Sequence, residues 1–248
     1  MKWMISGLLS LWIATGVVVG SPEDDKAEPS EATKVLEKSA EALTQVKFAR
    51  YDAAYKGTGW ATQYVPTIEG SVVLGEPSEY DILRFRCEVK LTPTGSEETL
   101  EYVVGSDGDL HFLIDAKEKM VYADMDEAVL GTRQRDLQRA LLRDFVAKEP
   151  LANDIKAEKV ELKDVETVDG VECQQVHVTY GETREAVWFI SKKDQLPRRV
   201  VRVYKNDKGE IGTTELTLSE LKVSKKVDLT QFKLTVPEGY KRTDDFAS

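Results

Sequence analysis

The sequence predicts a mainly β protein built on one strongly curved antiparallel sheet, or partial barrel, accompanied by two helices. The first observation is the number of short segments in which apolar and polar residues alternate, about a dozen between residues 48 and 236. The second is the Gly, Pro, Asp and Ser residues between these segments, which are typical of hairpin turns. So many strands exceed what a flat open sheet carries without curling, and helices can cap the mouth of a curved one.

The first thirty residues have the composition of an export signal followed by a leader. Residues 1–20 carry one early charge, Lys2, and an apolar run over 5–19, which predicts a cleaved signal peptide, with a retained membrane anchor as the alternative. Residues 21–30 are acidic and contain proline, which favours a disordered leader. The first cysteine is Cys87, so no lipid-bearing cysteine follows the cleavage region. We therefore expect a periplasmic or secreted, soluble protein with a single domain over residues 31–248.

Within this domain the hydrophobic period first indicates a helix and then strands. Apolar residues recur at steps of three and four from Ala32 to Val46, with Ser30 placed as an N-cap. The clearest strand is 82–91, where Phe85 and Val89 alternate with charged residues, so one face is buried and the other is wet. The expected strands are 48–55, 61–65, 70–74, 82–91, 99–104, 110–114, 120–125, 158–165, 171–180, 186–190, 198–204, 213–221 and 232–236.

A second helix is predicted between the two groups of strands, over residues 132–148, and Pro150 would stop it. One side of this helix is apolar, and the opposite side carries a basic stripe spaced by four residues. The stripe could meet anionic headgroups or an acidic partner, or it could be an ordinary solvated face. The apolar side comprises Leu137, Ala140, Leu141 and Phe145, and the stripe comprises Arg135, Arg139 and Arg143.

Charge and cysteine content narrow the partners and the chemistry. The chain has 44 acidic and 34 basic side chains and a net charge of −10, which argues against nucleic acid or an anionic membrane as a bulk partner. Cys87 and Cys173 are the only thiols. In an exported protein they could form a disulfide, or both could be buried as small apolar residues in strands.

Catalytic and metal-binding motifs are scarce. His111 and His177 both lie in strand patterns without metal-ligand spacing, and Asp107 and Asp109 lack the further ligands of a calcium loop. There is no nucleophile elbow, phosphate-binding loop or dinucleotide fingerprint. We expect a protein that is not an enzyme and that uses neither a cofactor nor a metal.

The stretch 186–240 contains Trp188 and Phe189 before a charged turn, then Leu196 and Pro197, then Phe232 before the run Val236-Pro237-Glu238-Gly239-Tyr240. With this order of parts it resembles the closing half of the periplasmic lipoprotein-carrier (LolA/LolB-like) superfamily. The resemblance implies an unclosed antiparallel barrel with a helical lid over a hydrophobic cavity that holds lipids or lipoproteins. It also implies that residues 132–148 form the lid, with Leu137, Leu141 and Phe145 facing the cavity.

These observations lead to a functional hypothesis. We expect a monomeric, exported binding protein or chaperone that holds a lipid or the acyl chains of a lipoprotein, in outer-membrane lipoprotein sorting. The alternative is a non-enzymatic periplasmic sensor or scaffold that docks a protein partner, for example a membrane-bound one. The apolar side chains could instead fill a solid core. The candidate lining residues are Leu83, Phe85, Val89, Leu91, Tyr102, Phe112, Ile114, Leu137, Leu141, Phe145 and Trp188.

Overall fold

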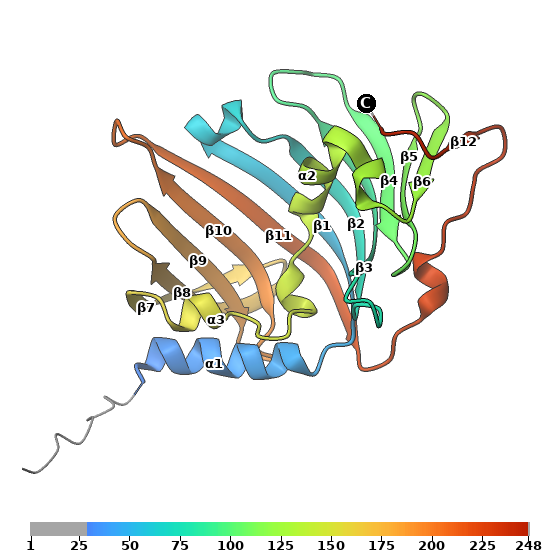
Figure 1. Cartoon of the computed structure of the whole chain (residues 1–248). Coiled ribbons are helices and arrows are strands. Elements are labelled where there is room, and N and C mark those ends of the chain that lie inside the picture. Colours follow the sequence, from blue (N-terminus) through green and yellow to red (C-terminus); the bar gives the residue numbers. More distant parts are fainter. Residues whose placement is uncertain (1–28, 248) are drawn as a thin grey trace, which may run out of the picture.

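A computed structural model describes residues 29–247, and one sheet of 12 strands organises nearly all of them (Figure 1). The strand order is β12-β6-β5-β4-β3-β2-β1-β11-β10-β9-β8-β7, and all neighbours are antiparallel except β12 and β6. The strands are β1 Phe48–Gly59, β2 Thr67–Gly75, β3 Arg84–Thr92, β4 Leu100–Ser106, β5 His111–Asp115, β6 Met120–Asp124, β7 Lys159–Val168, β8 Val171–Thr179, β9 Arg184–Ser191, β10 Pro197–Lys205, β11 Ile211–Ser224 and β12 Lys241–Thr243.

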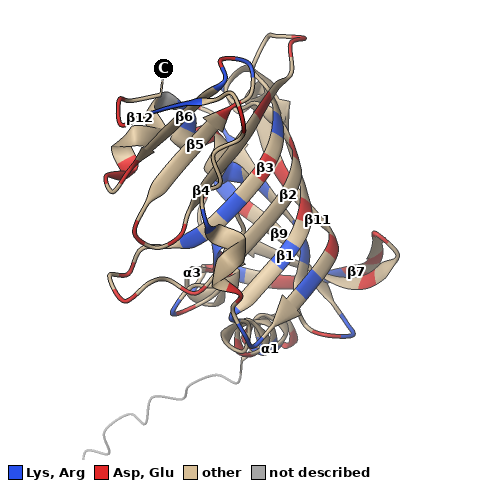
Figure 2. Ribbon diagram, turned by 90° about the vertical axis from the view of Figure 1, so that its right-hand side faces the viewer, with Lys and Arg blue, Asp and Glu red and all other residues tan. Residues whose placement is uncertain are grey.

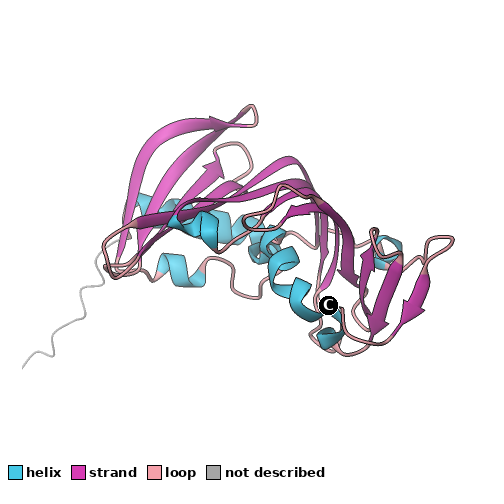
Figure 3. Ribbon diagram, turned by 90° about the horizontal axis from the view of Figure 1, so that it is seen from above, coloured by secondary structure: helices cyan, strands magenta, loops and turns pink. Residues whose placement is uncertain are grey.

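The sheet is open, because the two terminal strands, β12 and β7, do not pair with each other. Seen from above, it forms a single bent layer with most of the helical pieces on one side (Figure 3). The prediction of a mainly β protein with a mostly antiparallel sheet is therefore confirmed, and the prediction that this sheet is strongly curved into an unclosed barrel is wrong. Chain segments cover apolar side chains on both faces, so the sheet buries them without curling on itself.

Helix α1 (Glu31–Thr44) runs across the ends of the strands at the bottom of Figure 1. The Ser30 side chain accepts a hydrogen bond from the backbone N–H of Thr33, as an N-cap does. Leu36 and Leu43 are fully buried in the main core cluster. The predicted helix and its cap are thus confirmed. No helix within residues 29–247 is long and apolar enough to cross a membrane.

Residues on the strands alternate between two faces that are covered differently. We call the face that packs against α1 the inner face and the opposite side the outer face. On β1, Ala49, Tyr51, Ala53 and Tyr55 are buried on the inner face, whereas the residues between them are exposed. The inner face holds the main core cluster, which also takes in Phe85 of β3 and Trp188 of β9. The polar alternation in the sequence thus distinguishes the two faces correctly over most of the sheet.

The predicted helix over residues 132–148 is wrong as a single element. The chain instead forms the turns η2 (Glu127–Arg133), α2 (Gln134–Leu137), η3 (Gln138–Ala140) and η4 (Arg143–Phe145), followed by α3 (Ala152–Ile155). Leu141, between η3 and η4, has extended backbone angles, φ −86° and ψ 119°. We call residues 134–155 the strap, because they cross the inner face as a chain of short turns (Figure 1). The reason for the break lies in the sheet beneath, as described below.

Three further boundaries differ from the prediction. Residues 61–65 are not a strand: the chain leaves the sheet at Gly59, where φ is 59°, and forms η1 (Trp60–Gln63). The Trp60 indole N–H donates to the carbonyl of Glu210 at 3.0 Å and fixes this turn. Residues 232–236 are not a strand either, because Phe232 ends η5 (Leu229–Phe232) and its ring packs edge-on against Phe48. The short strand β12 was not predicted.

The last residues form a tail, residues 225–247, that crosses the outer face and returns to the inner one. Leu234 and Tyr240 pack on the outer cluster of Phe112, Ile114, Val121 and Ala123. The tail then pairs with β6 through β12, and Ala247 reaches the main cluster, where its N–H donates to the carbonyl of Val129 at 3.1 Å. The tail therefore covers the last strand edge on this side of the sheet.

Candidate functional site

A groove on the inner face lies between the strap and strands β10 and β11. It consists of two adjoining compartments that share Arg202 and Tyr204, and we call them together the central groove. The apolar compartment measures about 220 Å³ and the polar compartment about 380 Å³. Tyr55, Arg139, Leu141, Leu142, Val200, Arg202, Tyr204, Thr214 and Leu216 line the apolar compartment. Asp144, Asn153, Asp154, Tyr180, Arg184, Glu185, Arg202 and Tyr204 line the polar one.

One buried tyrosine holds the strap onto the sheet beside the apolar compartment. The Tyr51 hydroxyl donates to the carbonyl of Ala140 at 3.0 Å and accepts from the N–H of Leu142 at 2.9 Å. Its ring packs against Phe145, with the centroids 5.9 Å apart. Burial raises the pKa of the Tyr51 hydroxyl far above its ordinary value, so it stays protonated and can donate. These bonds take the backbone groups that a continuous helix would use, which explains why the strap is not helical here.

Arg139 stands at the mouth of the apolar compartment in a fixed position. Its guanidinium donates to the Tyr55 hydroxyl at 3.2 Å and to the Asp136 carboxylate at 3.3 Å, and it lies 6.0 Å from the centre of the Tyr55 ring. The Leu141 and Leu142 side chains are 8% and 3% exposed. This compartment therefore combines four aliphatic side chains with polar ones, and the cation Arg139 is held at its edge.

The polar compartment contains two carboxylates with defined partners. Asp154, on α3, accepts from the Trp188 indole N–H at 2.6 Å and from the Tyr180 hydroxyl. Asp144 accepts from the backbone N–H of Leu151 at 3.2 Å. Burial and the neighbouring Asp154 raise the pKa of the Asp144 carboxyl above its ordinary value, while the bond from Leu151 and the charge of Arg202 oppose this. Burial and Asp154 also raise the pKa of the Tyr180 hydroxyl.

The backbone of the strap is strained at this compartment. Leu151 has φ 56°, in the left-handed region, and it is 2% exposed. A bulky apolar residue rarely adopts this conformation. Here the strain places the Leu151 N–H on Asp144 and starts α3, which carries Asp154. Backbone strain of this kind concentrates at functional sites.

The residues predicted to line a cavity do not form one set. Most of them lie in the main core cluster of the inner face, and Leu83 packs against it partly buried. Phe112 and Ile114 lie in the outer cluster instead. Of the eleven, only Leu141 lines the central groove. The residues in the main cluster are Phe85, Val89, Leu91, Tyr102, Leu137, Leu141, Phe145 and Trp188.

The groove residues that the sequence did not predict come mostly from β10 and from the strap. Val200, Arg202 and Tyr204 alternate on β10, so their shared face was visible in the sequence. The sequence did not indicate which face of the sheet the strap covers. Of the basic stripe, only Arg139 lines the groove, whereas Arg143 donates to the Gln138 side chain.

A second hollow lies on the outer face, under the tail, and we call it the outer pocket. It measures about 550 Å³ and lies between β3–β5 and the tail residues Thr235, Pro237 and Tyr240. Its charged residues form ion pairs on the surface, Arg86 with Glu88 at 2.9 Å and Lys90 with Glu101 at 3.5 Å. Figure 2 shows basic and acidic residues interspersed along these strands.

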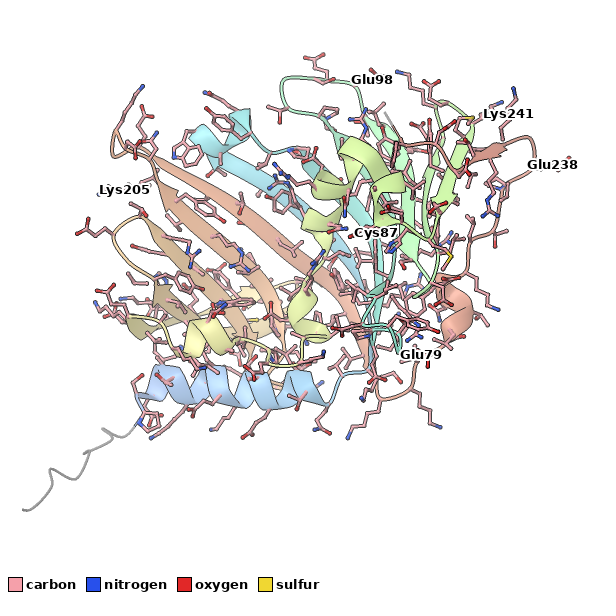
Figure 4. All side chains as sticks on the ribbon, viewed as in Figure 1. Glu79, Cys87, Glu98, Lys205, Glu238 and Lys241 are labelled. Carbon is pink, nitrogen blue, oxygen red and sulfur yellow. The ribbon has the colours of Figure 1, made fainter. Side chains whose placement is uncertain are left out.

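Both cysteines are free and buried. Cys87, labelled in Figure 4, lies on β3 in the main cluster, and Cys173 lies in a small outer cluster with Val168 and Phe189. Burial raises the pKa of both thiols. Of the two interpretations of the cysteines, the structure therefore shows the buried apolar one.

The histidines and the acidic residues do not form a metal site in the part of the chain that the structure describes. His111 is 6% exposed, and burial lowers its pKa. Burial also lowers the pKa of His177. Within residues 29–247 no group of three or more His, Cys, Asp or Glu side chains is arranged to hold a metal ion.

Residues 88–244 match the family model described as predicted periplasmic protein, DUF2092. The chain belongs to this family. The match covers the polar compartment, the outer pocket except Arg86, and most of the sheet. It places this member among predicted periplasmic proteins. The expected signal peptide over residues 1–20 lies outside the described residues, and so does all but the end of the leader over 21–30.

Comparison with solved structures finds similar folds at low sequence identity. The lipoprotein LppX of Mycobacterium tuberculosis is 11% identical, with a TM-score of 0.49, over 82% of this chain and 100% of that one. MucB in the Pseudomonas aeruginosa MucA/MucB complex is 13% identical, with a TM-score of 0.45, over 83% and 62%. A LolA superfamily protein of Nitrosomonas europaea is 11% identical, with a TM-score of 0.34, over 82% and 97%.

All three TM-scores lie below 0.5, so these likenesses by themselves assign neither a ligand nor a partner to this chain. A comparison with curated proteins finds no match.

Proposed function

We propose that this protein is a non-enzymatic periplasmic binding protein that holds an amphiphile, such as a lipid or an acylated lipoprotein, in the central groove. The observation that carries the proposal is that an apolar and a polar compartment adjoin on one sheet face and share the lining residues Arg202 and Tyr204. An alkyl chain in the apolar compartment would gain about 0.8 kcal/mol per buried methylene. Residues 31–248 would act as one binding domain, with the strap in the role expected of a lid.

The strap has the features that a cover over such a site needs. Its polar contacts to the sheet are few and local: Arg139 with Tyr55, Tyr51 with Ala140 and Leu142, and Asp154 with Trp188 and Tyr180. Two of its apolar side chains, Leu141 and Leu142, line the groove. A chain that enters the groove would lie beside Leu141 while these contacts keep the strap on the sheet.

The test is uptake of an uncharged apolar probe, N-phenyl-1-naphthylamine, whose fluorescence rises in an apolar site. Thr214 lines the apolar compartment and is 8% exposed, so Thr214→Trp fills it from the floor. We expect the native protein to take up the probe and Thr214→Trp to lose at least about tenfold in affinity, as burial of several methylene-sized units predicts. Thr217→Trp is the matched control, since Thr217 points to the outer face of the same strand.

Circular dichroism and thermal unfolding establish that both variants fold. Absence of uptake by the native protein contradicts the proposal and favours the alternative of a domain that docks a protein partner. Equal loss in both variants also contradicts it, because the probe would then bind outside the groove.

A further inference from the structure

The polar compartment differs from an ordinary charged surface, because Asp154, Tyr180 and Arg184 are held in place by side-chain contacts. Asp154 is 7% exposed and is fixed by Trp188 and Tyr180. The Arg184 guanidinium stacks on the Tyr180 ring, 4.6 Å from its centre. A ligand that binds here therefore finds oriented groups and pays little to order them.

The compartment offers hydrogen-bond acceptors and donors side by side. Asp144, Asp154 and Glu185 supply carboxylate oxygens, and Arg184 and Arg202 supply N–H groups. The recorded bonds to Asp144 and Asp154 leave lone pairs on both carboxylates unused. A ligand that bonds to both the carboxylates and the guanidinium groups must donate and accept hydrogen bonds at neighbouring atoms. Adjacent hydroxyl groups do this, because each can both donate and accept.

The charges of the compartment argue against an ionic ligand. A phosphate or sulfate would approach three carboxylates, and a quaternary ammonium would approach two guanidinium groups. Either ion would have to give up its hydration shell next to a side chain of the same charge, which is unfavourable. An uncharged group carries no such penalty and can satisfy both signs of partner.

The two compartments meet at Arg202 and Tyr204, so a single molecule can occupy both. Arg202 also lies over the Trp188 ring, 5.8 Å from its centre, which ties this contact point to Asp154. We infer that the polar compartment recognises an uncharged polyhydroxyl headgroup, such as a glycosyl group, attached to a chain that lies in the apolar compartment. This inference rests on the proposed function and adds the class of headgroup.

The experiment compares three eight-carbon amphiphiles that differ only in headgroup: octyl β-D-glucoside, octyl phosphate and octyltrimethylammonium. Each displaces N-phenyl-1-naphthylamine from the native protein below its micelle concentration. We expect the glucoside to displace the probe at a concentration at least about tenfold lower than either ionic amphiphile, because several hydrogen bonds add to the same chain.

Two variants assign that preference to the polar compartment. Asn153 and Arg184 are both exposed residues that line it, so Asn153→Ala combined with Arg184→Ala should leave the fold intact. We expect this double variant to lose most of the glucoside preference and to keep its affinity for the probe. Arg50→Ala, on the outer face of β1, removes an exposed arginine elsewhere and should change neither.

Equal displacement by the three amphiphiles overturns the inference but leaves the proposed function standing. A glucoside preference that survives in the double variant overturns it as well, since the headgroup would then be read elsewhere. Failure of the native protein to take up the probe contradicts the proposed function itself.

Discussion

The central groove and the outer pocket lie on opposite faces of the same sheet and are built in opposite ways. The outer pocket, at about 550 Å³, is similar in volume to the two groove compartments of about 220 and 380 Å³ taken together, yet the side chains of its Lys90–Glu101 pair are 66% and 62% exposed. At the groove, the buried lining residue Asp154 and the neighbouring buried residues Tyr51 and Trp188 each make hydrogen bonds with defined partners. Volume therefore does not distinguish the two hollows, but the burial of their polar groups does.

This difference has an energetic consequence. A hydrogen bond to a buried group is costly to lose, because the remaining partner is left without water. The two charges of an exposed ion pair are hydrated whether or not they are paired, so the pair contributes little to the free energy of unfolding. Substitutions of similar size should thus change the free energy of unfolding strongly in and beside the groove and weakly in the outer pocket.

The largest effect is expected for Tyr51→Phe, which removes one hydroxyl. The Ala140 carbonyl and the Leu142 N–H would both lose their partner next to the core. We expect the free energy of unfolding to fall by about 2–4 kcal/mol, since each unsatisfied buried group costs about 1–3 kcal/mol. Urea unfolding measures the loss, and amide hydrogen exchange at Leu142 should become faster.

Tyr122→Phe is the control, because Tyr122 is a partly buried tyrosine on the inner side and its hydroxyl makes no hydrogen bond within residues 29–247. It should change the unfolding free energy by less than about 0.5 kcal/mol. Similar losses in the two variants would show that the hydroxyl of Tyr51 does not hold the strap.

A smaller effect, which depends on pH, is expected for Asp144→Asn. Because folding raises the pKa of Asp144, the folded protein binds its proton more readily than the unfolded chain does. This group therefore stabilises the fold at low pH, and the contribution is lost as the pH rises through its folded pKa. An amide oxygen can still accept from Leu151, and the charge facing Asp154 and Arg202 disappears.

We therefore expect Asp144→Asn to gain stability relative to the native protein between pH 4 and pH 7, measured by thermal unfolding across that range. Asp164→Asn, on exposed β7, should follow the native protein at every pH. A difference that stays constant with pH would contradict a raised pKa at Asp144.

The elements that the sequence predicted correctly are those whose pattern depends on near neighbours. Helix α1 has an apolar stripe and a capping Ser30, and β3 alternates cleanly between buried and charged residues. Both patterns are complete within about a dozen residues. The order of these elements sufficed to predict a mainly β protein with a mostly antiparallel sheet.

The strap and the groove were not predictable in this way. The strap sequence has helical spacing, but its backbone is taken by Tyr51, about 90 residues earlier in the chain. On β5, His111, Phe112, Leu113 and Ile114 are all buried, because the tail covers the outer face there. Period-two reasoning cannot assign a face to such a strand, which is why Phe112 and Ile114 were grouped with the wrong side.

The smallest effect should come from Lys90→Gln in the outer pocket. The Lys90–Glu101 pair is solvated on both sides, so its loss should cost less than about 0.5 kcal/mol and should vanish in high salt. Arg139→Gln provides the matched change in the groove, where the side chains of Arg139 and Asp136 are 26% and 34% exposed and Tyr55 is a further partner. We expect it to cost about 1–2 kcal/mol. Equal costs for the two substitutions, measured by urea unfolding at low and high salt, would remove the distinction between the faces, because the polar contacts of the groove would then be as weakly held as those of the open surface.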